Sequence, residues 1–285
     1  MTGAGQHMQT LTPHDDITVI IQGPLNESSL SNIPNYQKTA KNIIVSAWDT
    51  YDNKTKECLP EDPNVLFITS DSNWVENWRG RYYNNSNIAF QIITTLNGLD
   101  KVKTKYVIKV RSDEIYTDIG YFAEAVKANE EKLITNNVLF QLDSKAKFHP
   151  SDHAVGGTTS NMRGTFERLE NYCSRYAEKE KIPLVGRELD VNGLEEISPE
   201  TLMCVCFLQH KGVDINVGDS KKIMLDNFNV VSVKQMGRYL VMVKGKPYLK
   251  WPEQDKSDGY LLDGVGYVDG IEENWIFPIE SLEEL

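Results

Sequence analysis

The first half of the chain alternates short runs of β-branched and aliphatic residues with longer polar or amphipathic segments. Each run is bounded by turn-forming residues, which is typical of strands buried inside an α/β protein. Helical segments between strands return the chain to the same edge, so that neighbouring strands run parallel. The alternation therefore predicts an α/β fold with a mostly parallel sheet and helices on both faces. Its strands are expected at residues 17–21, 43–48, 65–69, 106–110 and 138–142.

Apolar residues at helical spacing predict the helices that accompany these strands. One apolar stripe runs from Ile88 to Leu99 and indicates a helix that Asn85 or Ser86 can cap. Further helices are expected at residues 119–133, 160–181 and 198–209.

Prolines mark two further boundaries. Pro34 should interrupt any helix within residues 28–41. Ser198 followed by Pro199 is typical of a helix start, with an N-cap and then proline at the first helical position. Beyond that helix we expect only short β-like runs, at residues 230–233 and 239–243.

Charge and composition exclude several classes of protein. The 285 residues include 41 acidic and 30 basic side chains, which gives a net charge of −11. This balance repels the phosphate backbone of nucleic acids, although a few local cations can still hold a small anionic ligand. No apolar run approaches the roughly 20 residues that a membrane helix needs, and the first residues lack a signal-peptide pattern. We expect a cytoplasmic protein with no membrane span and no nucleic-acid partner.

Several familiar motifs are absent. The chain has no G-x-G-x-x-G between a strand and a helix, no P-loop and no G-x-S-x-G elbow. Their absence argues against a nicotinamide dehydrogenase, a P-loop ATPase and a serine hydrolase of the elbow type. The four cysteines show no zinc spacing, so we interpret them as reduced thiols.

Four of the expected strands end in polar turns. Open α/β sheets bind ligands at the carboxyl ends of their strands, so these turns should line a site. Asp49 and Asp71 also fit a second interpretation, as turn residues that hydrogen-bond the local backbone. The turn residues are Gln22-Gly23-Pro24, Asp49, Asp71 and Arg111-Ser112-Asp113.

The last of these turns carries the sharpest chemical signal. A hydrophobic strand delivers Arg111 and Asp113 into one polar turn. Enzymes that use nucleotide sugars must neutralise a diphosphate leaving group, which a carboxylate-bound Mg²⁺ or Mn²⁺ can do. A guanidinium adds a bidentate phosphate contact. Asp113 would be the metal ligand and Arg111 a diphosphate partner or a brace for the turn, and a surface Arg–Asp pair is the plain alternative.

The order of the segments adds to this signal. A strand ending in Gln22-Gly23-Pro24 is followed by Ile-Val-Ser-x-Trp-Asp ending at Asp49, by a helix ending in Asn97-Gly98-Leu99, and by a strand from Thr104 to Asp113. In this order they resemble the WavE lipopolysaccharide-synthesis family over residues 17–115. The resemblance extends, less specifically, through residues 148–157 and 198–200.

The resemblance implies a GT-A-like glycosyltransferase. Its donor would be a nucleotide-diphosphate sugar, expected to be UDP-linked, and its acceptor a hydroxyl of an oligosaccharide or glycan. Residues 17–145 would form the nucleotide-sugar-binding half and residues 146–285 the acceptor-binding half with the C-terminal segment, after a flexible N-terminus at residues 1–16. The family's fold usually carries a D-x-D metal motif, but here Arg111 holds its first position. Mn²⁺ or Mg²⁺ would then rest on Asp113, with Glu114 beside it.

The resemblance also implies which residues bind the donor. The turn at residues 22–24 would border the base through its backbone, and Asp49 would contact the base or the ribose. Arg81, together with Arg79, would reach a phosphate unless both are solvated surface residues. The implied donor-binding positions are Gln22, Gly23, Pro24, Asp49, Asp71, Arg81 and Arg111.

Transfer to a hydroxyl also needs a base. We expect Asp152 to be the base of an inverting, single-displacement reaction, because it follows the fifth expected strand and lies beside His153. Rival carboxylates are Glu195, Glu196 and Glu200, of which Glu200 can instead favour a helix dipole. Five aromatic residues of the second half either form a platform on which the acceptor sugar stacks or belong to the hydrophobic core. They are Tyr239, Tyr248, Trp251, Tyr260 and Trp275.

Two other functions remain open at this point. A sugar-1-phosphate nucleotidyltransferase uses a similar sheet but grips a triphosphate with a glycine-rich, cationic loop after the first strand. Residues 22–27 contain one glycine and no cation, which argues against it. A noncatalytic carbohydrate-binding protein would bind glycans without nucleotide affinity.

Overall fold

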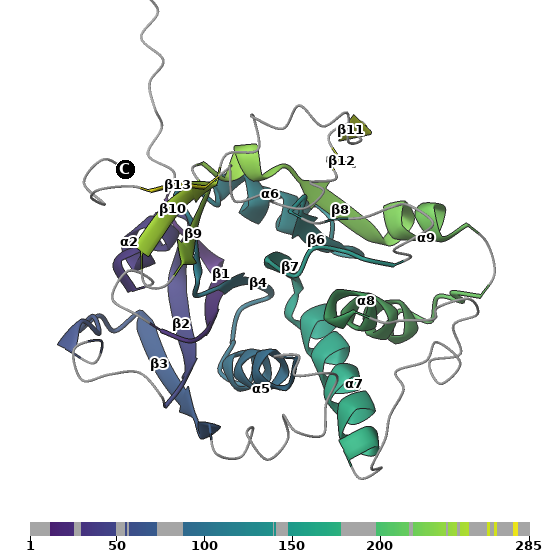
Figure 1. The fold of residues 1–285 in the computed structure, drawn as a ribbon, viewed down its shortest axis with the longest axis horizontal. Helices are drawn as coiled ribbons and strands as arrows, with labels where there is room; N and C mark the ends of the chain where they lie inside the picture. The colour runs from purple at the N-terminus through teal and green to yellow at the C-terminus, as the bar shows by residue number, and fades with distance from the viewer. Residues whose placement is uncertain are drawn as a thin grey trace, which may run out of the picture.

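The computed structural model describes the chain in segments, and its centre is one large sheet. The described residues are 12–25, 30–49, 55, 57–72, 88–138, 140, 148–177, 198–216, 219–237, 239–243, 246–250, 261–262, 265–266 and 276–278. The sheet has seven strands in the order β3-β2-β1-β4-β7-β6-β8 (Figure 1). They are β1 (His14–Gly23), β2 (Ala40–Trp48), β3 (Val65–Ser70), β4 (Tyr106–Arg111), β6 (Leu133–Asn136), β7 (Ala154–Thr158) and β8 (Phe228–Val231).

The sheet is mostly parallel, as expected. Strands β3, β2, β1 and β4 are parallel neighbours, and so are β6 and β8. Only β7 runs against its neighbours β4 and β6. The carboxyl ends of the six parallel strands therefore meet at one edge, and the segment that enters β7 lies at this same edge.

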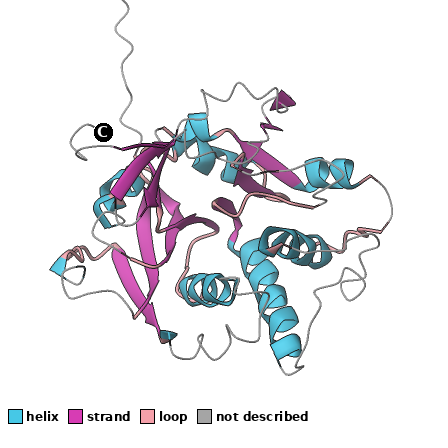
Figure 2. Ribbon diagram, viewed as in Figure 1, coloured by secondary structure: helices cyan, strands magenta, loops and turns pink. Residues whose placement is uncertain are grey.

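Helices cover both faces of the sheet (Figure 2). One face carries α5 (Ile88–Leu99), α7 (Thr159–Ala177) and α8 (Pro199–His210), and the other carries α2 (Ile33–Gln37), α6 (Gly120–Ala128) and the short η3 (Val233–Met236). Helix α9 (Ser220–Asn227) leads into β8. The expected α/β class, a mostly parallel sheet flanked by helices, is confirmed.

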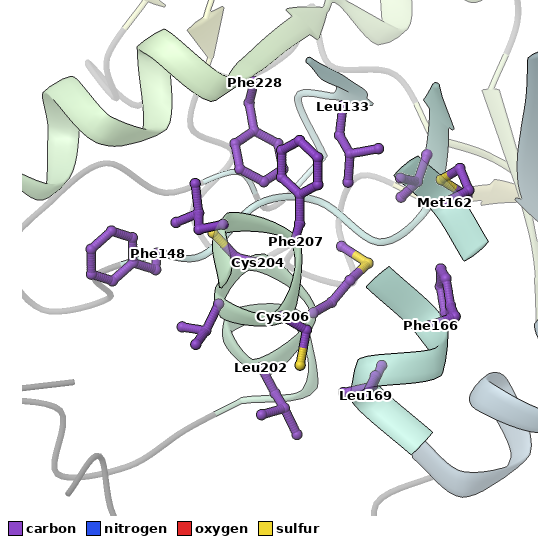
Figure 3. Close-up of a cluster of buried hydrophobic side chains, with 14 of the residues drawn as sticks. Leu133, Phe148, Met162, Phe166, Leu169, Leu202, Cys204, Cys206, Phe207 and Phe228 are labelled. Atoms are coloured by element: carbon purple, nitrogen blue, oxygen red, sulfur yellow. The ribbon is translucent and has the colours of Figure 1, made fainter. Parts of the chain in front are cut away.

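Helix α8 is buried on nearly every side. Figure 3 shows its own apolar side chains, such as Phe207, packed among those of other elements, such as Leu133 and Phe228. Burial raises the pKa of the Cys204 and Cys206 thiols, so both stay protonated and pack as small apolar groups. The helix begins as the sequence predicts, because the Ser198 hydroxyl accepts a hydrogen bond from the Thr201 N–H (3.1 Å). None of the helices in the described part combines the length and hydropathy that a membrane crossing requires.

Two expected boundaries are wrong. The fifth strand, expected at residues 138–142, is β6 at Leu133–Asn136, and the preceding helix ends at Ala128 rather than residue 133. The apolar residues Val138 and Phe140 misled the prediction because they are buried without belonging to β6. Pro34 does not interrupt a helix but lies in the first turn of α2, where no backbone N–H is needed. The expected caps Asn85 and Ser86 lie outside the described residues.

A second, smaller sheet joins the first directly after β4. Strand β5 (Glu114–Tyr116) pairs antiparallel with β9 (Tyr239–Val243) in the order β13-β10-β9-β5. The other strands are β10 (Lys246–Lys250) and β13 (Ile276–Pro278), and β11 (Leu261–Leu262) pairs with β12 (Val265–Gly266). The turn between β4 and β5 therefore lies where the two sheets meet.

Candidate active site

The topology brings three segments together at the carboxyl edge of the large sheet. Gln22 at the end of β1 pairs with Arg111 at the end of β4, and Val110 pairs with Ala154 at the start of β7. The residues that follow β4 and those that precede β7 therefore lie on neighbouring strands. This edge is where a parallel sheet places a ligand.

Arg111 and Asp113 form a two-point ion pair across the turn that follows β4. The guanidinium donates from Nε to Oδ1 (2.9 Å) and from a terminal nitrogen to Oδ2 (2.8 Å) of Asp113. Both side chains are about one-third exposed. Burial lowers the Arg111 pKa, but the hydrogen bonds that Arg111 donates to Asp113 and the charges of Glu114 and Asp152 raise it overall, so the guanidinium is charged.

Ser112 ties this turn to the end of β1. Its N–H donates to the Gln22 carbonyl (2.8 Å), and its hydroxyl donates to the Pro24 carbonyl (2.5 Å). Gly23 lies between them with φ of +127°, and a Cβ there would be 2.7 Å from the Ser112 hydroxyl oxygen. The two polar turns predicted at β1 and β4 are thus in direct contact, and glycine is required at the point of closest approach.

Glu114 is buried rather than available to a ligand. Its carboxylate accepts a hydrogen bond from the Tyr116 hydroxyl (2.7 Å), contacts Nδ1 of His153 and lies 3.6 Å from the Arg111 Nε. Burial alone would raise the pKa of Glu114, but His153, Arg111 and Tyr116 together lower it to about 2. The Glu114 side chain, which was expected beside a metal bound to Asp113, is only 2% exposed.

Lys109 is a buried cation that the sequence reasoning missed. It lies two residues before Arg111 on β4, so both side chains leave the same face of the sheet. Its ammonium is fully buried and donates to the backbone carbonyl of Asp152 (2.6 Å). Burial lowers the Lys109 pKa, and the Asp152 charge opposes this change. A lysine within the apolar run Tyr-Val-Ile-Lys-Val was the signal that could have identified it.

Asp152 lies in the middle of this charged group. Its Oδ2 accepts a hydrogen bond from Gln91 Nε2 of α5 (2.7 Å), whereas its buried Oδ1 has no hydrogen-bond partner among the described residues. Burial would raise the pKa of Asp152, but the charges of Lys109, His153 and Arg111 and the Gln91 hydrogen bond lower it overall. The carboxylate is therefore ionised, with one oxygen still able to accept a hydrogen bond.

A chain of buried hydrogen bonds fixes the segment around Asp152. Asn136 at the end of β6 donates to the Tyr116 hydroxyl (2.9 Å) and accepts from the Ser151 hydroxyl (2.6 Å). Through Tyr116 the chain continues to Glu114 and His153. The residues before β7 are thus linked to the turn after β4 by side chains from β5 and β6. No sequence motif announced Gln91, Tyr116 or Asn136.

The structure does not bring Asp49 and Asp71 to this group. Asp49 is exposed, and its Oδ1 accepts from the Ser72 N–H (3.0 Å), a bond that lowers the Asp49 pKa. This contact fits the turn interpretation. Asp49 follows β2, two strand spacings or about 10 Å from β4, and the exposed Asp71 follows β3, one strand further away.

Other predicted positions lie elsewhere or outside the described residues. Glu200 is in the first turn of α8, where its Oε2 is 3.6 Å from the His149 Nε2. This position favours the helix dipole, as the plainer interpretation had it. The structure does not describe Arg79, Arg81, Glu195, Glu196, Trp251, Tyr260, Trp275 or the side chains of Tyr239 and Tyr248.

The carboxylates of this edge fit a divalent cation poorly. Asp113 is paired with Arg111 and Glu114 with His153, while Oδ1 of Asp152 lies 4.0 Å from His153 Nε2 in the field of the buried Lys109 charge. Mg²⁺ and Mn²⁺ need several oxygen ligands, usually with one or two carboxylates free to bind. In the part of the chain that the structure describes, no three His, Cys, Asp or Glu side chains are grouped to hold a metal ion.

Comparison with known proteins identifies one matching family. The model of a family described as "WavE lipopolysaccharide synthesis" matches residues 17–170, which is more than half of the chain. No curated protein matches the sequence significantly.

Two solved structures that match this chain do so at low sequence identity. The galactosyltransferase LgtC in complex with donor and acceptor sugar analogues is 11% identical, with a TM-score of 0.46 over 67% of this chain and 70% of that one. HddC from Yersinia pseudotuberculosis is 11% identical, with a TM-score of 0.34 over 52% of this chain and 78% of that one.

Proposed function

Because the chain belongs to the WavE lipopolysaccharide synthesis family, we propose that it is a glycosyltransferase that moves a sugar from a nucleotide-diphosphate sugar to a hydroxyl of a glycan. One observation carries the proposal. A partly exposed guanidinium lies at the carboxyl edge of a mostly parallel sheet, together with an ionised carboxylate of which one oxygen accepts no hydrogen bond from the described residues. These are an anion-binding group and a proton-accepting group, which the two substrates of such a transfer require.

Arg111 is the group that would bind the donor. Two of its five N–H groups are used by Asp113, which holds the guanidinium plane in place. The remaining N–H groups match the spacing of phosphate oxygens. We propose UDP as the nucleotide, with the turn at residues 22–24 bordering its base and Asp49 on the side of the ribose.

Asp152 is the group that would bind the acceptor. In a single displacement the acceptor oxygen bonds to the anomeric carbon while the bond from that carbon to the diphosphate breaks. The hydroxyl proton passes to Oδ1 of Asp152, and the nucleoside diphosphate leaves with the bonding electrons. The lowered Asp152 pKa makes the carboxylate a weak base, so the proton moves late, when the new bond has made the hydroxyl acidic. The product has inverted configuration.

The test is to incubate the protein with UDP-, GDP- and dTDP-sugars and with glycan acceptors. We expect at least one sugar nucleotide to raise the melting temperature and to be hydrolysed slowly, releasing the nucleoside diphosphate. Asp152→Asn should retain that binding and lower turnover by about 100-fold or more, the range typical of a lost general base. Asp214→Asn, a change at an exposed turn, is the matched control.

Three results would contradict the proposal. The first is that no sugar nucleotide affects the melting temperature, and the second is that full turnover persists in Asp152→Asn. The third is that pyrophosphate is released from a nucleoside triphosphate and a sugar 1-phosphate. The last result would instead indicate a nucleotidyltransferase, and glycan binding without nucleotide binding would indicate a carbohydrate-binding protein.

A further inference from the structure

We propose that this site binds the diphosphate of its donor without a divalent cation, and that Arg111 supplies the positive charge that a metal would otherwise provide. The inference rests on the proposed function and concerns how the same site neutralises its leaving group. Three features of the described residues lead to it: the state of Asp113, the state of the other carboxylates, and the unused capacity of the guanidinium.

Asp113 is already fully engaged. Each of its oxygens accepts one hydrogen bond from Arg111, at 2.9 and 2.8 Å. A cation bound to Asp113 at the usual distance of about 2.0–2.6 Å would lie beside a fixed guanidinium and would be repelled by it. Charge-assisted fork pairing of this kind is also strong in its own right, so a metal would compete for the carboxylate.

The neighbouring carboxylates offer no substitute. The side chains of Glu114 and Asp152 are 2% and 8% exposed, and each faces a basic partner. Glu114 contacts His153, while Asp152 is close to Lys109. Asp113 and Glu114 are thus occupied by Arg111 and His153, and the one remaining oxygen, Oδ1 of the buried Asp152, is too few for the oxygen cage that a hard cation needs.

Arg111, in contrast, has donors to spare. Apart from the two N–H groups that bind Asp113, its three other N–H groups have no hydrogen-bond partner among the described residues. The side chain is 35% exposed at the edge where the strands end. Glu114, 3.6 Å from Nε, supports it from the buried side. Asp113 and Glu114 therefore hold the Arg111 guanidinium in place. Its planar geometry fixes the direction of the three remaining N–H groups, which can be shared between two phosphate groups.

Calorimetric titration with UDP and GDP tests this inference. The protein is titrated once in excess EDTA and once with saturating Mn²⁺. We expect one nucleoside diphosphate to bind with dissociation constants that agree within about threefold in the two buffers. Affinity at least about tenfold higher with Mn²⁺, equivalent to about 1.4 kcal/mol, would overturn the inference and leave the proposed function intact. Absence of binding in both buffers would overturn both.

Variants separate the two charge sources. Arg111→Gln should weaken binding about tenfold or more in both buffers, whereas Arg111→Lys, which keeps the charge but loses the fork, should weaken it less. Arg163→Gln is the matched control, since Arg163 is 33% exposed and pairs with Asp100 on another part of the surface. Circular dichroism of each variant checks that it is folded.

Asp113→Asn provides the opposite test. If Asp113 only orients Arg111, the affinity of this variant for the nucleoside diphosphate falls by the same modest factor with EDTA and with Mn²⁺. A loss confined to the Mn²⁺ buffer would show that Asp113 binds the ion and would overturn the inference. Electron paramagnetic resonance of Mn²⁺ mixed with the nucleotide-free protein gives an independent reading, for which we expect the spectrum of the free ion.

Discussion

Lys109→Met removes one positive charge from the buried group around Asp152. Lys109 is fully buried and donates to the Asp152 backbone, and its charge is the largest influence that keeps the Asp152 carboxylate ionised. Methionine fills most of the lysine's volume, so that the change is mainly electrostatic. Leaving a buried charge without the opposite charge that compensates it typically costs about 3–5 kcal/mol.

This cost translates into a measurable shift in the melting temperature. Unfolding entropy is about 2.1 cal/mol/K per residue, or roughly 0.6 kcal/mol/K for 285 residues. Each kcal/mol therefore lowers Tm by about 1.7 °C, and Lys109→Met should lower it by roughly 5–8 °C. Scanning calorimetry or circular dichroism measures the shift.

A double variant isolates the electrostatic part. In Lys109→Met/Asp152→Asn neither charge is present, so its destabilisation should be smaller than the sum of the two single changes. Lys105→Met is the control, because the Lys105 ammonium pairs with Glu130 at the surface (2.6 Å), and exposed pairs contribute little. A Tm for Lys109→Met equal to that of the control, or strict additivity in the double variant, would refute the reasoning.

Two further changes test other parts of the site. Gly23→Ala should lower Tm by a few degrees, because its φ is +127° and a Cβ would meet the Ser112 hydroxyl at 2.7 Å. Gly212→Ala should lower Tm less, because Gly212 has φ of +71° and no atom lies within 4 Å of the added Cβ. Equal losses of Tm in thermal melts would contradict this expectation. The Glu114 pKa is about 2 in the folded protein against an ordinary 4.5, so its stabilisation is present above about pH 4.5 and is lost as the pH falls toward 2. Glu114→Gln should therefore be less stable at neutral pH, by a margin that shrinks over that acidic range, and a margin independent of pH would show that the Glu114 charge contributes nothing.

The sequence predicted the strands with turn signals at both ends. Strands β1 to β4 lie close to their expected positions because their β-branched runs stop at Gly23, Asp49 and similar residues. Strand β6 was misplaced because the apolar residues after it, Val138 and Phe140, are buried by packing rather than by pairing in the sheet. Local periodicity cannot distinguish these two causes of burial.

The candidate site divides in the same way. The meeting of the β1 and β4 turns follows from the rule that parallel strands end at one edge, and the pairing of Gln22 with Arg111 agrees with it. The contacts of Asp152 did not follow from the sequence, because they depend on α5 supplying Gln91 and on β7 running antiparallel to β4. Hydrogen-bond partners that depend on how distant segments pack together cannot be predicted from a single sequence.

The antiparallel pairing of Glu114 with Val241 makes the turn after β4 depend on a strand encoded late in the chain. During synthesis, β5 leaves the ribosome long before β9, so the backbone groups that later pair with β9 must wait for most of the protein to be made. Contacts between such distant segments form slowly, since a long loop must close first. The strands of the large sheet up to β7 can assemble earlier, so a nascent protein would acquire most of that sheet before the turn that carries Arg111 gains its final support.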